Sequence, residues 1–318
     1  MKLTSCLSAL ALWGFAALAQ GQEVSIFTAE HVYFGNGQNK REVTQDVKLP
    51  SGSESYEQVI LSVRTYCPND RCDWWDRKGA LYVETDEGQT VELMRFMTPY
   101  RVGARWNLDV TDLQPLLKGP KRFRVFIDTW VGPGHPQGDG WLVDATLKYT
   151  KGVPKDRPLA VLPLVSAKSI EYGNPSVETL AGRVVEFSEE FSKAKIWTYV
   201  TGHGQGNTDN CAEFCQRRHT LSLGNWSTSR VIWRDNCRDT VTEGPQMGTW
   251  IYDRAGWCPG DKVNPWVETL PGSALGLGQE TSFQWQPEAY TNHRRDDYDN
   301  NGHTMPYYQI SAFMVLFE

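Results

Sequence analysis

The chain has 318 residues, of which 38 are acidic and 32 basic, so its formal net charge at pH 7 is -6. Nucleic-acid binding normally depends on a basic face that neutralises phosphates, and this charge balance argues against such a partner. The length exceeds what one compact β core usually reaches, which favours two domains.

The N-terminus has a pattern typical of a secretory signal. Lys2 precedes a mostly apolar run from Leu3 to Leu18, which ends in the small-x-small sequence Ala17-Leu18-Ala19. We expect residues 1–19 to be a signal peptide that is cleaved near Ala19, which would make the mature protein secreted or periplasmic. No later segment approaches the roughly 20 apolar residues that a membrane helix needs, so we expect no membrane partner.

Short alternating segments follow the signal. β-Branched and aromatic residues recur at near period two between Gly, Pro, Asp and Asn residues, a pattern that predicts strands. The predicted strands are Tyr56–Tyr66, Ala80–Glu84, Val91–Met97, Phe123–Trp130 and Trp141–Tyr149. The polar stretch from Lys151 to Pro158 contains two prolines and interrupts the pattern, so we interpret it as a linker.

The alternation resumes after the linker, and no segment carries a sustained helical apolar stripe. Further strands are predicted at Leu159–Val165, Gly182–Phe187, Lys195–Val200, Thr220–Leu223, Arg230–Trp233, Thr249–Tyr252, Thr281–Trp285 and Tyr308–Phe317. Many evenly spaced strands with turn residues between them favour sandwiches or jelly rolls. We therefore predict an all-β fold with two tandem antiparallel jelly-roll (β-sandwich) domains, over residues 23–151 and 157–318.

The cysteines predict disulfides. Cys6 leaves with the signal, so seven cysteines become six, an even number that suits an oxidising compartment. Two tight pairs carry carboxylates inside or beside them, in CPNDRCDWWDR and in CAEFC. We expect the pairs Cys67–Cys72, Cys211–Cys215 and Cys237–Cys258, although spacing alone leaves other pairings open. A short ring stiffens its loop and is a good mount for a catalytic side chain.

The same region offers two metal-binding alternatives. A structural zinc site is compatible with the spacing of His203, Cys211, Cys215 and His219. A copper monooxygenase-like site would use His203, His219, His303 and Met305, but the HxH and His-His pairs common in such sites are missing. The exported setting favours disulfides, and we expect no metal and no cofactor.

Tryptophan is abundant, with 13 residues, and several lie beside charged residues, such as Trp74 and Trp75 between Asp73 and Asp76. Aromatic faces beside carboxylates suit sugars, because C–H faces stack on rings while hydroxyls take hydrogen bonds. Most tryptophans in a β-rich protein fill cores. The tryptophan content alone is therefore only weak support for the hypothesis that the protein binds carbohydrate.

Several long motifs occur in one order along the chain: CPNDRCDWWDR, RFMTPYRVG, LDVTDLQPLL, CAEFC followed by His219-Thr220, and DRAGWCPG. On these motifs the chain, from about Val24 to its C-terminus, resembles the bacterial peptide-N-glycosidase F family of amidases. The resemblance implies two jelly rolls packed side by side, a substrate cleft at their junction and no metal. It also implies hydrolysis of the amide bond between the innermost N-acetylglucosamine and an asparagine side chain, which becomes aspartate.

Carried over by position, the resemblance implies catalytic roles for Asp76 in WDR and for Glu213 in CAEFC. The third acidic residue of the family's site is a glutamate, whereas the matching residue here is Asp128, shorter by one methylene. The resemblance further implies a substrate cleft lined by Arg77, Trp75, Trp130, Arg254 and His203.

The chemistry of amide hydrolysis accounts for these residue types independently of the family resemblance. An amide resists water, so a catalyst must activate the water and protonate the nitrogen. If Asp76 and Glu213 approach each other, repulsion and burial should raise one pKa, which keeps one group as acid and the other as base. We expect a monomeric, metal-independent amidase whose partners are N-glycosylated peptides and proteins. The alternative is a non-catalytic glycan-binding protein on the same scaffold.

Overall fold

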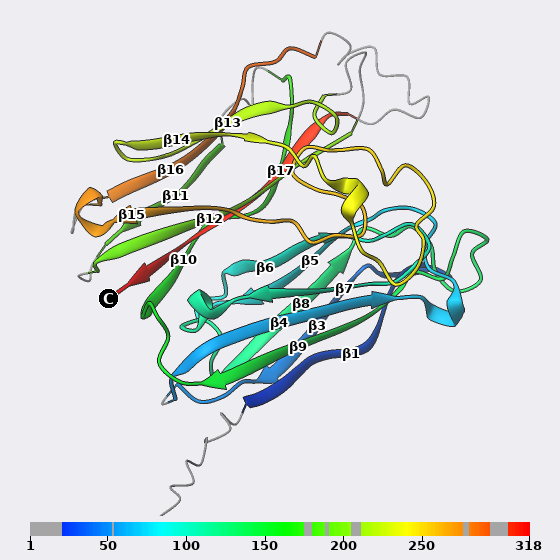
Figure 1. Ribbon diagram of the computed structural model, residues 1–318, viewed down its shortest axis with the longest axis horizontal. Helices are drawn as coiled ribbons and strands as arrows, with labels where there is room; N and C mark the ends of the chain where they lie inside the picture. The colour runs from blue at the N-terminus through cyan, green and yellow to red at the C-terminus, as the bar shows by residue number, and fades with distance from the viewer. Residues whose placement is uncertain are drawn as a thin grey trace, which may run out of the picture.

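The first half of the chain forms two antiparallel sheets (Figure 1). The computed structural model describes residues 21–52, 54–174, 180–187, 191–204, 211–275, 280–292 and 305–318. One sheet has the strand order β2-β1-β9-β4-β7 and the other β3-β8-β5-β6. These strands are β1 Gly21–Gly35, β2 Gln38–Lys40, β3 Glu42–Lys48, β4 Tyr56–Tyr66, β5 Lys78–Glu84, β6 Thr90–Met97, β7 Ala104–Asp109, β8 Pro120–Ile127 and β9 Trp141–Lys151.

The second half repeats this architecture, with sheets of order β10-β17-β12-β15 and β11-β16-β13-β14. Its strands are β10 Pro158–Glu171, β11 Leu180–Glu186, β12 Lys193–His203, β13 Arg217–Leu223, β14 Trp226–Ile232, β15 Trp266–Pro271, β16 Glu280–Pro287 and β17 Tyr307–Phe317. Single 3-10 turns occur at η1 Pro68–Asp70, η2 Thr111–Leu113, η4 Cys237–Asp239 and η5 Gly272–Ala274. The predicted all-β class with antiparallel sandwiches is confirmed. Within the described ranges, no helix has the length and apolarity to cross a membrane.

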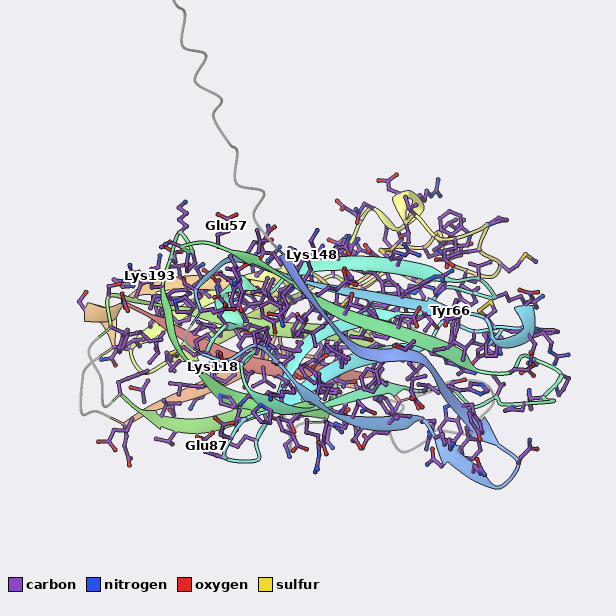
Figure 2. The ribbon with its side chains drawn as sticks, turned by 90° about the horizontal axis from the view of Figure 1, so that it is seen from below. Glu57, Tyr66, Glu87, Lys118, Lys148 and Lys193 are labelled. Atoms are coloured by element: carbon purple, nitrogen blue, oxygen red, sulfur yellow. A yellow bond between two sulfur atoms is a disulfide. The ribbon has the colours of Figure 1, made fainter. Side chains whose placement is uncertain are left out.

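Burial along the strands shows which sheets face solvent. In β8 the buried residues alternate with more exposed ones, so that Phe123, Val125 and Ile127 point into the first sandwich. Strand β17 is instead buried on both faces over almost its whole length. Exposed charged side chains such as Glu57 and Lys148 lie at the periphery (Figure 2).

The two halves lie side by side and share a core where they meet (Figure 1). One hydrophobic cluster contains Leu93 and Phe96 of β6 together with Trp197 of β12 and Phe313 of β17. The sheet of β5 and β6 therefore packs against the sheet of β12 and β17, which explains why these strands are buried on both faces. Loops from both halves then meet at one end of this junction.

A buried arginine on β6 donates hydrogen bonds across the junction. The Arg95 side chain on β6 is fully buried, and its guanidinium donates to both carboxylate oxygens of Glu92 at 2.7 and 2.8 Å. It also donates to Thr201 Oγ1 at 2.9 Å on β12 and to the Gln309 carbonyl at 2.8 Å on β17. Hydrogen bonds from both halves thus satisfy this charge, and they fix one sandwich relative to the other.

The predictions of disulfides, of one strand and of the signal peptide have different outcomes. All three predicted disulfides form, Cys67–Cys72, Cys211–Cys215 and Cys237–Cys258. The predicted strand at Thr249–Tyr252 is wrong, because this segment is a turn whose carbonyls accept hydrogen bonds from Arg254. The predicted signal peptide lies outside the described residues, which begin at Gly21.

Candidate active site

The loop between β4 and β5 carries Asp76, and a neighbouring buried carboxylate, Asp73, holds this loop in place. The Asp73 side chain is fully buried and accepts hydrogen bonds from Arg77 Nε at 2.7 Å and from Thr129 Oγ1 at 2.7 Å. It also accepts the backbone N–H of Trp75 at 3.0 Å. Asp73 therefore binds both neighbours of Asp76, the backbone of Trp75 and the side chain of Arg77.

Glu213 lies in the loop between β12 and β13, inside the five-residue ring closed by Cys211 and Cys215. The Glu213 backbone N–H donates to the Gly204 carbonyl at 3.3 Å, and the Glu213 carbonyl accepts from Ala255 N at 2.9 Å. The Gly204 N–H in turn donates to Glu213 Oε2 at 3.2 Å. The ring and these bonds together orient the carboxylate.

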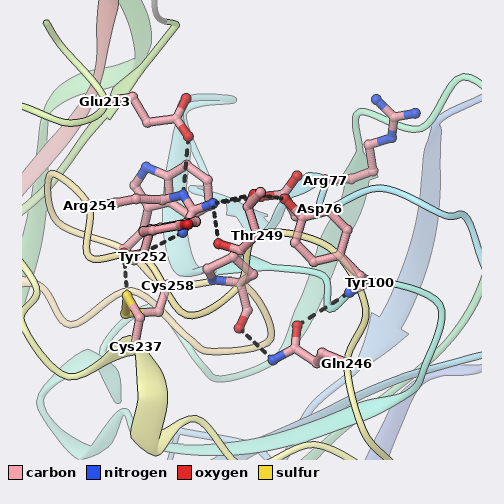
Figure 3. Close-up of polar contacts among 12 residues, drawn as sticks. Asp76, Arg77, Tyr100, Glu213, Cys237, Gln246, Thr249, Tyr252, Arg254 and Cys258 are labelled. Carbon is pink, nitrogen blue, oxygen red and sulfur yellow. Dashed lines mark hydrogen bonds and ion pairs between the residues drawn. A yellow bond between two sulfur atoms is a disulfide. The ribbon is translucent and has the colours of Figure 1, made fainter. Parts of the chain in front are cut away.

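Arg254 joins the two carboxylates (Figure 3). Its Nε donates to Glu213 Oε1 at 3.1 Å, and its Nη2 lies 4.0 Å from Asp76 Oδ2. Its Nη1 and Nη2 also donate to the carbonyls of Tyr252 and Thr249. The Arg254 side chain is 1% exposed, whereas those of Asp76 and Glu213 are 17% and 16% exposed. A ligand can therefore reach the acids but not the arginine between them.

The surroundings shift the pKa of both acids upward. Burial, with the charge of Asp76 adding to it, raises the pKa of Glu213 to about 7 against the opposing effect of Arg254. Burial also raises the pKa of Asp76, although Arg254, the Tyr100 hydroxyl and Arg77 favour its ionised form. Near neutral pH the pair of acids therefore holds one proton, and this proton lies mainly on Glu213.

A chain of hydroxyls supports Asp76 from the other side. Arg254 Nη2 donates to Thr249 Oγ1 at 3.2 Å, and Thr249 Oγ1 lies 3.0 Å from the Tyr100 hydroxyl. Because the arginine is a donor only, the Thr249 hydrogen is free to point at Tyr100, and Tyr100 then donates to Asp76. Sequence reasoning missed both hydroxyls, although Tyr100 lies inside the RFMTPYRVG motif.

Two of the predicted aromatic residues are available to a ligand. Trp75 is 50% exposed and Trp130 is 52% exposed. The Arg41 guanidinium lies 4.1 Å from the centroid of the Trp130 ring and pairs with Asp128 at 3.3 Å. Asp128 is thus placed beside Trp130, and no described contact joins its carboxylate to Asp76 or Glu213.

Arg254 and His203, both predicted to contact substrate, have buried side chains. His203 stacks on Trp257 at 5.4 Å and on Tyr307 at 5.1 Å between ring centroids. Its Nε2 lies 2.8 Å from Thr201 Oγ1, and burial holds the pKa of His203 well below its usual range. His203 is therefore a neutral side chain packed against the rings of Trp257 and Tyr307. Arg77 is 20% exposed and is bound to Asp73.

The zinc alternative fails at Cys211 and Cys215, which form a disulfide with each other and are not free thiolates. Of the copper alternative's residues, His219 is fully buried against Trp285, and His303 lies outside the described residues. In the portion of the chain that the structure describes, no group of three or more His, Cys, Asp or Glu residues could hold a metal ion.

The fold and the site define a class of two-sandwich proteins in which a loop from each half contributes one acid to a shared site. Two family models match, Peptide-N-glycosidase F, N terminal, over residues 84–148 and Peptide-N-glycosidase F, C terminal, over residues 174–315. Together they cover more than half of the chain. The chain belongs to the peptide-N-glycosidase F family.

Individual relatives agree with this assignment. The peptide-N(4)-(N-acetyl-beta-D-glucosaminyl)asparagine amidase F of Elizabethkingia miricola is 28% identical over 284 residues, which is 84% of this chain and 76% of that protein. A crystal structure of a peptide-N(4)-(N-acetyl-beta-D-glucosaminyl) asparagine amidase is 25% identical with a TM-score of 0.81, covering 94% of this chain and 96% of that one. PNGase F from Flavobacterium meningosepticum, described as a glycosylasparaginase, has the same fold, with a TM-score of 0.80 at 24% identity over 94% of this chain and 96% of its own.

Proposed function

We propose that the protein is an amidase that hydrolyses the bond between the innermost N-acetylglucosamine of an N-glycan and the asparagine side chain. The family membership supports the reaction class. The observation that carries the proposal is the placement of Asp76 and Glu213, from opposite halves of the chain, on one buried arginine with both acids still open to a ligand. The products would be aspartate in the peptide and a free glycosylamine.

The two acids have different roles in this proposal. Burial raises the pKa of Asp76, but Arg254, Tyr100 and Arg77 favour its ionised form, and in this proposal Asp76 takes a proton from water as that water attacks the amide carbon. Glu213, with its pKa raised to about 7, donates a proton to the departing nitrogen as the C–N bond breaks. The proton left on Asp76 returns to Glu213 through solvent, since both side chains are partly exposed.

Substrate binding is assigned to the exposed aromatic residues. Trp75 directly precedes Asp76, and half of its surface is free to pack on the sugar or the peptide. Trp130 presents a ring that is braced from one side by Arg41. Arg254 is a positioning residue in this proposal, because its donors are bound to protein atoms and its side chain is buried.

The direct test is release from an N-glycopeptide, read by mass spectrometry, with conversion of asparagine to aspartate as the signature. We expect Asp76→Asn to lower the rate by about a thousandfold, within the range known for loss of a general base. Asp46→Asn is the matched control, because Asp46 is an exposed aspartate of the same half that pairs with Arg122. A protein that binds glycans but never converts asparagine would instead be a glycan-binding protein.

We further propose that the protein is exported. Three disulfides that use six of the seven cysteines suit an oxidising compartment, and the N-terminal sequence has the pattern of a signal with a cleavage sequence at Ala19. N-terminal sequencing of the protein from its native source would test this, and a mature N-terminus upstream of the apolar run would contradict it.

A further inference from the structure

A lysine with no hydrogen-bond or ion-pair partner among the described residues follows Asp76 by two positions. Lys78 begins β5, two residues after Asp76, and its side chain is half-buried. Its ammonium lies 5.4 Å from the centroid of the Tyr307 ring, and no described residue accepts a hydrogen bond from it or forms an ion pair with it. Burial lowers the pKa of Lys78 to about 8, although the charge of Asp128 opposes this. Charged groups in such positions are normally paired.

Tyr307 faces this lysine from the other half of the chain. It begins β17, is half-buried, and stacks on His203. No described residue binds its hydroxyl. Burial raises the pKa of Tyr307 to about 12, and the charges of Asp128 and Glu213 both contribute. The phenol therefore stays protonated, within electrostatic reach of the Glu213 end of the acid pair and of the carboxylate beside Trp130.

The chemistry of these groups limits what they can bind. An ammonium only donates hydrogen bonds, and a phenol donates or accepts. The carboxylates of Asp76, Glu213 and Asp128 disfavour an anion here. A neutral group rich in oxygen fits best, and sugar hydroxyls and acetamido carbonyls are of this kind.

We propose that Lys78 and Tyr307 form a polar subsite that binds the carbohydrate through its hydroxyl and acetamido oxygens, beside the acid pair. This inference deepens the proposed function and rests on it for the identity of the natural ligand. The two residues are specificity-determining: Lys78 donates to an acceptor oxygen of the sugar next to the cleaved bond, and Tyr307 bonds a second oxygen. Trp130, with half of its surface free, lies on the Asp128 side, where Arg41 contacts both residues.

Calorimetric titration with N,N′-diacetylchitobiose, a disaccharide of two N-acetylglucosamine units, tests the subsite without requiring catalysis. We expect Lys78→Met to raise the Kd about tenfold and Tyr307→Phe about threefold, as for loss of a charged and a neutral hydrogen bond. Lys193→Met is the control, because Lys193 also packs on an aromatic ring, 5.2 Å from the Phe317 centroid, but at the opposite end of β12 from His203. Its Kd should equal that of the unaltered protein.

A pH series separates a bound ammonium from a merely structural lysine. The groups that face Lys78 are Asp128, Glu92 and Arg95, with His203 and Tyr307 from the second half. Arg95 remains paired with Glu92, His203 remains neutral and Tyr307 remains protonated between about pH 7.5 and 9.5. Above pH 8, where Glu213 with its pKa of about 7 is already ionised, the affinity of the unaltered protein should fall as Lys78 loses its proton, and Lys78→Met should remove this fall.

Each outcome decides one proposal. Disaccharide binding that is unchanged in both variants, or absent from the unaltered protein, overturns the subsite. Binding that depends on Lys78 and Tyr307 without any release of glycan supports the subsite and overturns the amidase. Thermal unfolding checks that the variants fold, and Tyr307→Phe, which removes a single oxygen atom, decides the matter if Lys78→Met does not fold.

Discussion

The charge state of the site follows from one buried guanidinium shared by two acids. Arg254 supplies a single positive charge at 3.1 Å from Glu213 and 4.0 Å from Asp76. One cation cannot fully offset two carboxylates in a poorly solvated site, so one of the acids keeps a proton. The closer contact does not make Glu213 the more acidic group, because burial outweighs the arginine. This division of charge is what an acid–base reaction on an amide needs.

The raised pKa of Glu213 predicts a stability that depends on pH. The folded pKa of about 7 lies above the ordinary value of 4.5, so between these values the unfolded chain has released a proton that the folded protein keeps. Unfolding therefore becomes easier as pH rises through this window. Relative to Glu213→Gln, the unaltered protein should lose about 3 kcal/mol of unfolding free energy between about pH 4 and pH 8. Urea unfolding of both proteins across this range measures the difference.

Glu243 supplies a control of opposite sign. Its hydrogen bond with Arg64, at 2.7 Å, lowers the pKa of Glu243 below 4.5. Its contribution to stability is therefore present above pH 4.5 and is lost as pH falls further. If Glu213→Gln and the unaltered protein show parallel stability curves from pH 4 to 8, then Glu213 does not hold a proton in the folded state.

The site residues that could be found from the sequence lie in local motifs, whereas those that were missed depend on contacts between distant segments. Asp76 and Glu213 lie inside motifs whose resemblance to a family pointed to them. Asp73 lies in the same motif as Asp76, but its role depends on a hydrogen bond that it accepts from Thr129, more than fifty positions away. Lys78 and Tyr307 have no local signal at all, because their meeting depends on how the two sandwiches pack.

At the scale of strands, local alternation was informative where a strand has one buried and one solvated face. The predicted strand Tyr56–Tyr66 matches β4, and Trp141–Tyr149 falls within β9, Trp141–Lys151. Strand β3, Glu42–Lys48, was not predicted, because its residues are mostly exposed and pair only with β8. The apolar residues of Thr249–Tyr252 resembled a strand, but this turn folds around the Arg254 side chain, a contact that no local pattern encodes.

The short ring around Glu213 should matter more to activity than to stability. In the chain-entropy view, a disulfide between residues four apart contributes about 2 kcal/mol, and one between residues 21 apart about 3.5 kcal/mol. Replacing Cys211 and Cys215 by serine should therefore destabilise the protein less than replacing Cys237 and Cys258. Without the ring, the loop no longer holds the Glu213 side chain in one position, and we expect the rate of glycan release to fall about a hundredfold.

Denaturant unfolding and glycopeptide release, measured on the same preparations, check this prediction. The rate is to be corrected for the folded fraction, so that loss of activity is not confused with loss of fold. A serine variant of Cys211 and Cys215 whose corrected rate equals that of the unaltered protein would show that the ring does not position Glu213. The hydrogen bonds from Gly204 and Ala255 would then be enough to hold the loop.

At the scale of the whole molecule, the site exists only where the two sandwiches meet. Asp76 and Lys78 come from the first half, and Glu213, Arg254 and Tyr307 come from the second. Any sliding of one half against the other would change the distance between the acids. The shared hydrophobic cluster resists separation of the two halves. Directional hydrogen bonds are needed to fix the position of one half relative to the other, and Arg95 supplies them.

Arg95→Met should therefore destabilise the protein and lower activity together. It leaves the buried carboxylate of Glu92 without its cation, a change that typically costs about 3 to 5 kcal/mol. Glu92→Leu added to Arg95→Met removes the unpaired charge and should restore much of the stability. Activity should recover less, because the hydrogen bonds from Arg95 to Thr201 and Gln309 that join the halves remain absent. Urea unfolding and glycopeptide release on the single and double variants measure both effects.

The contrast between the two variants separates stability from alignment of the halves. Arg122→Met is the control for loss of an arginine, because Arg122 pairs with Asp46 at the surface, where its removal should change little. If the double variant regains stability and full activity alike, the apolar surfaces alone set the register of the sandwiches, and Arg95 serves only to neutralise Glu92. If stability returns without activity, the buried arginine aligns the acids from opposite halves, and the junction itself is part of the active site.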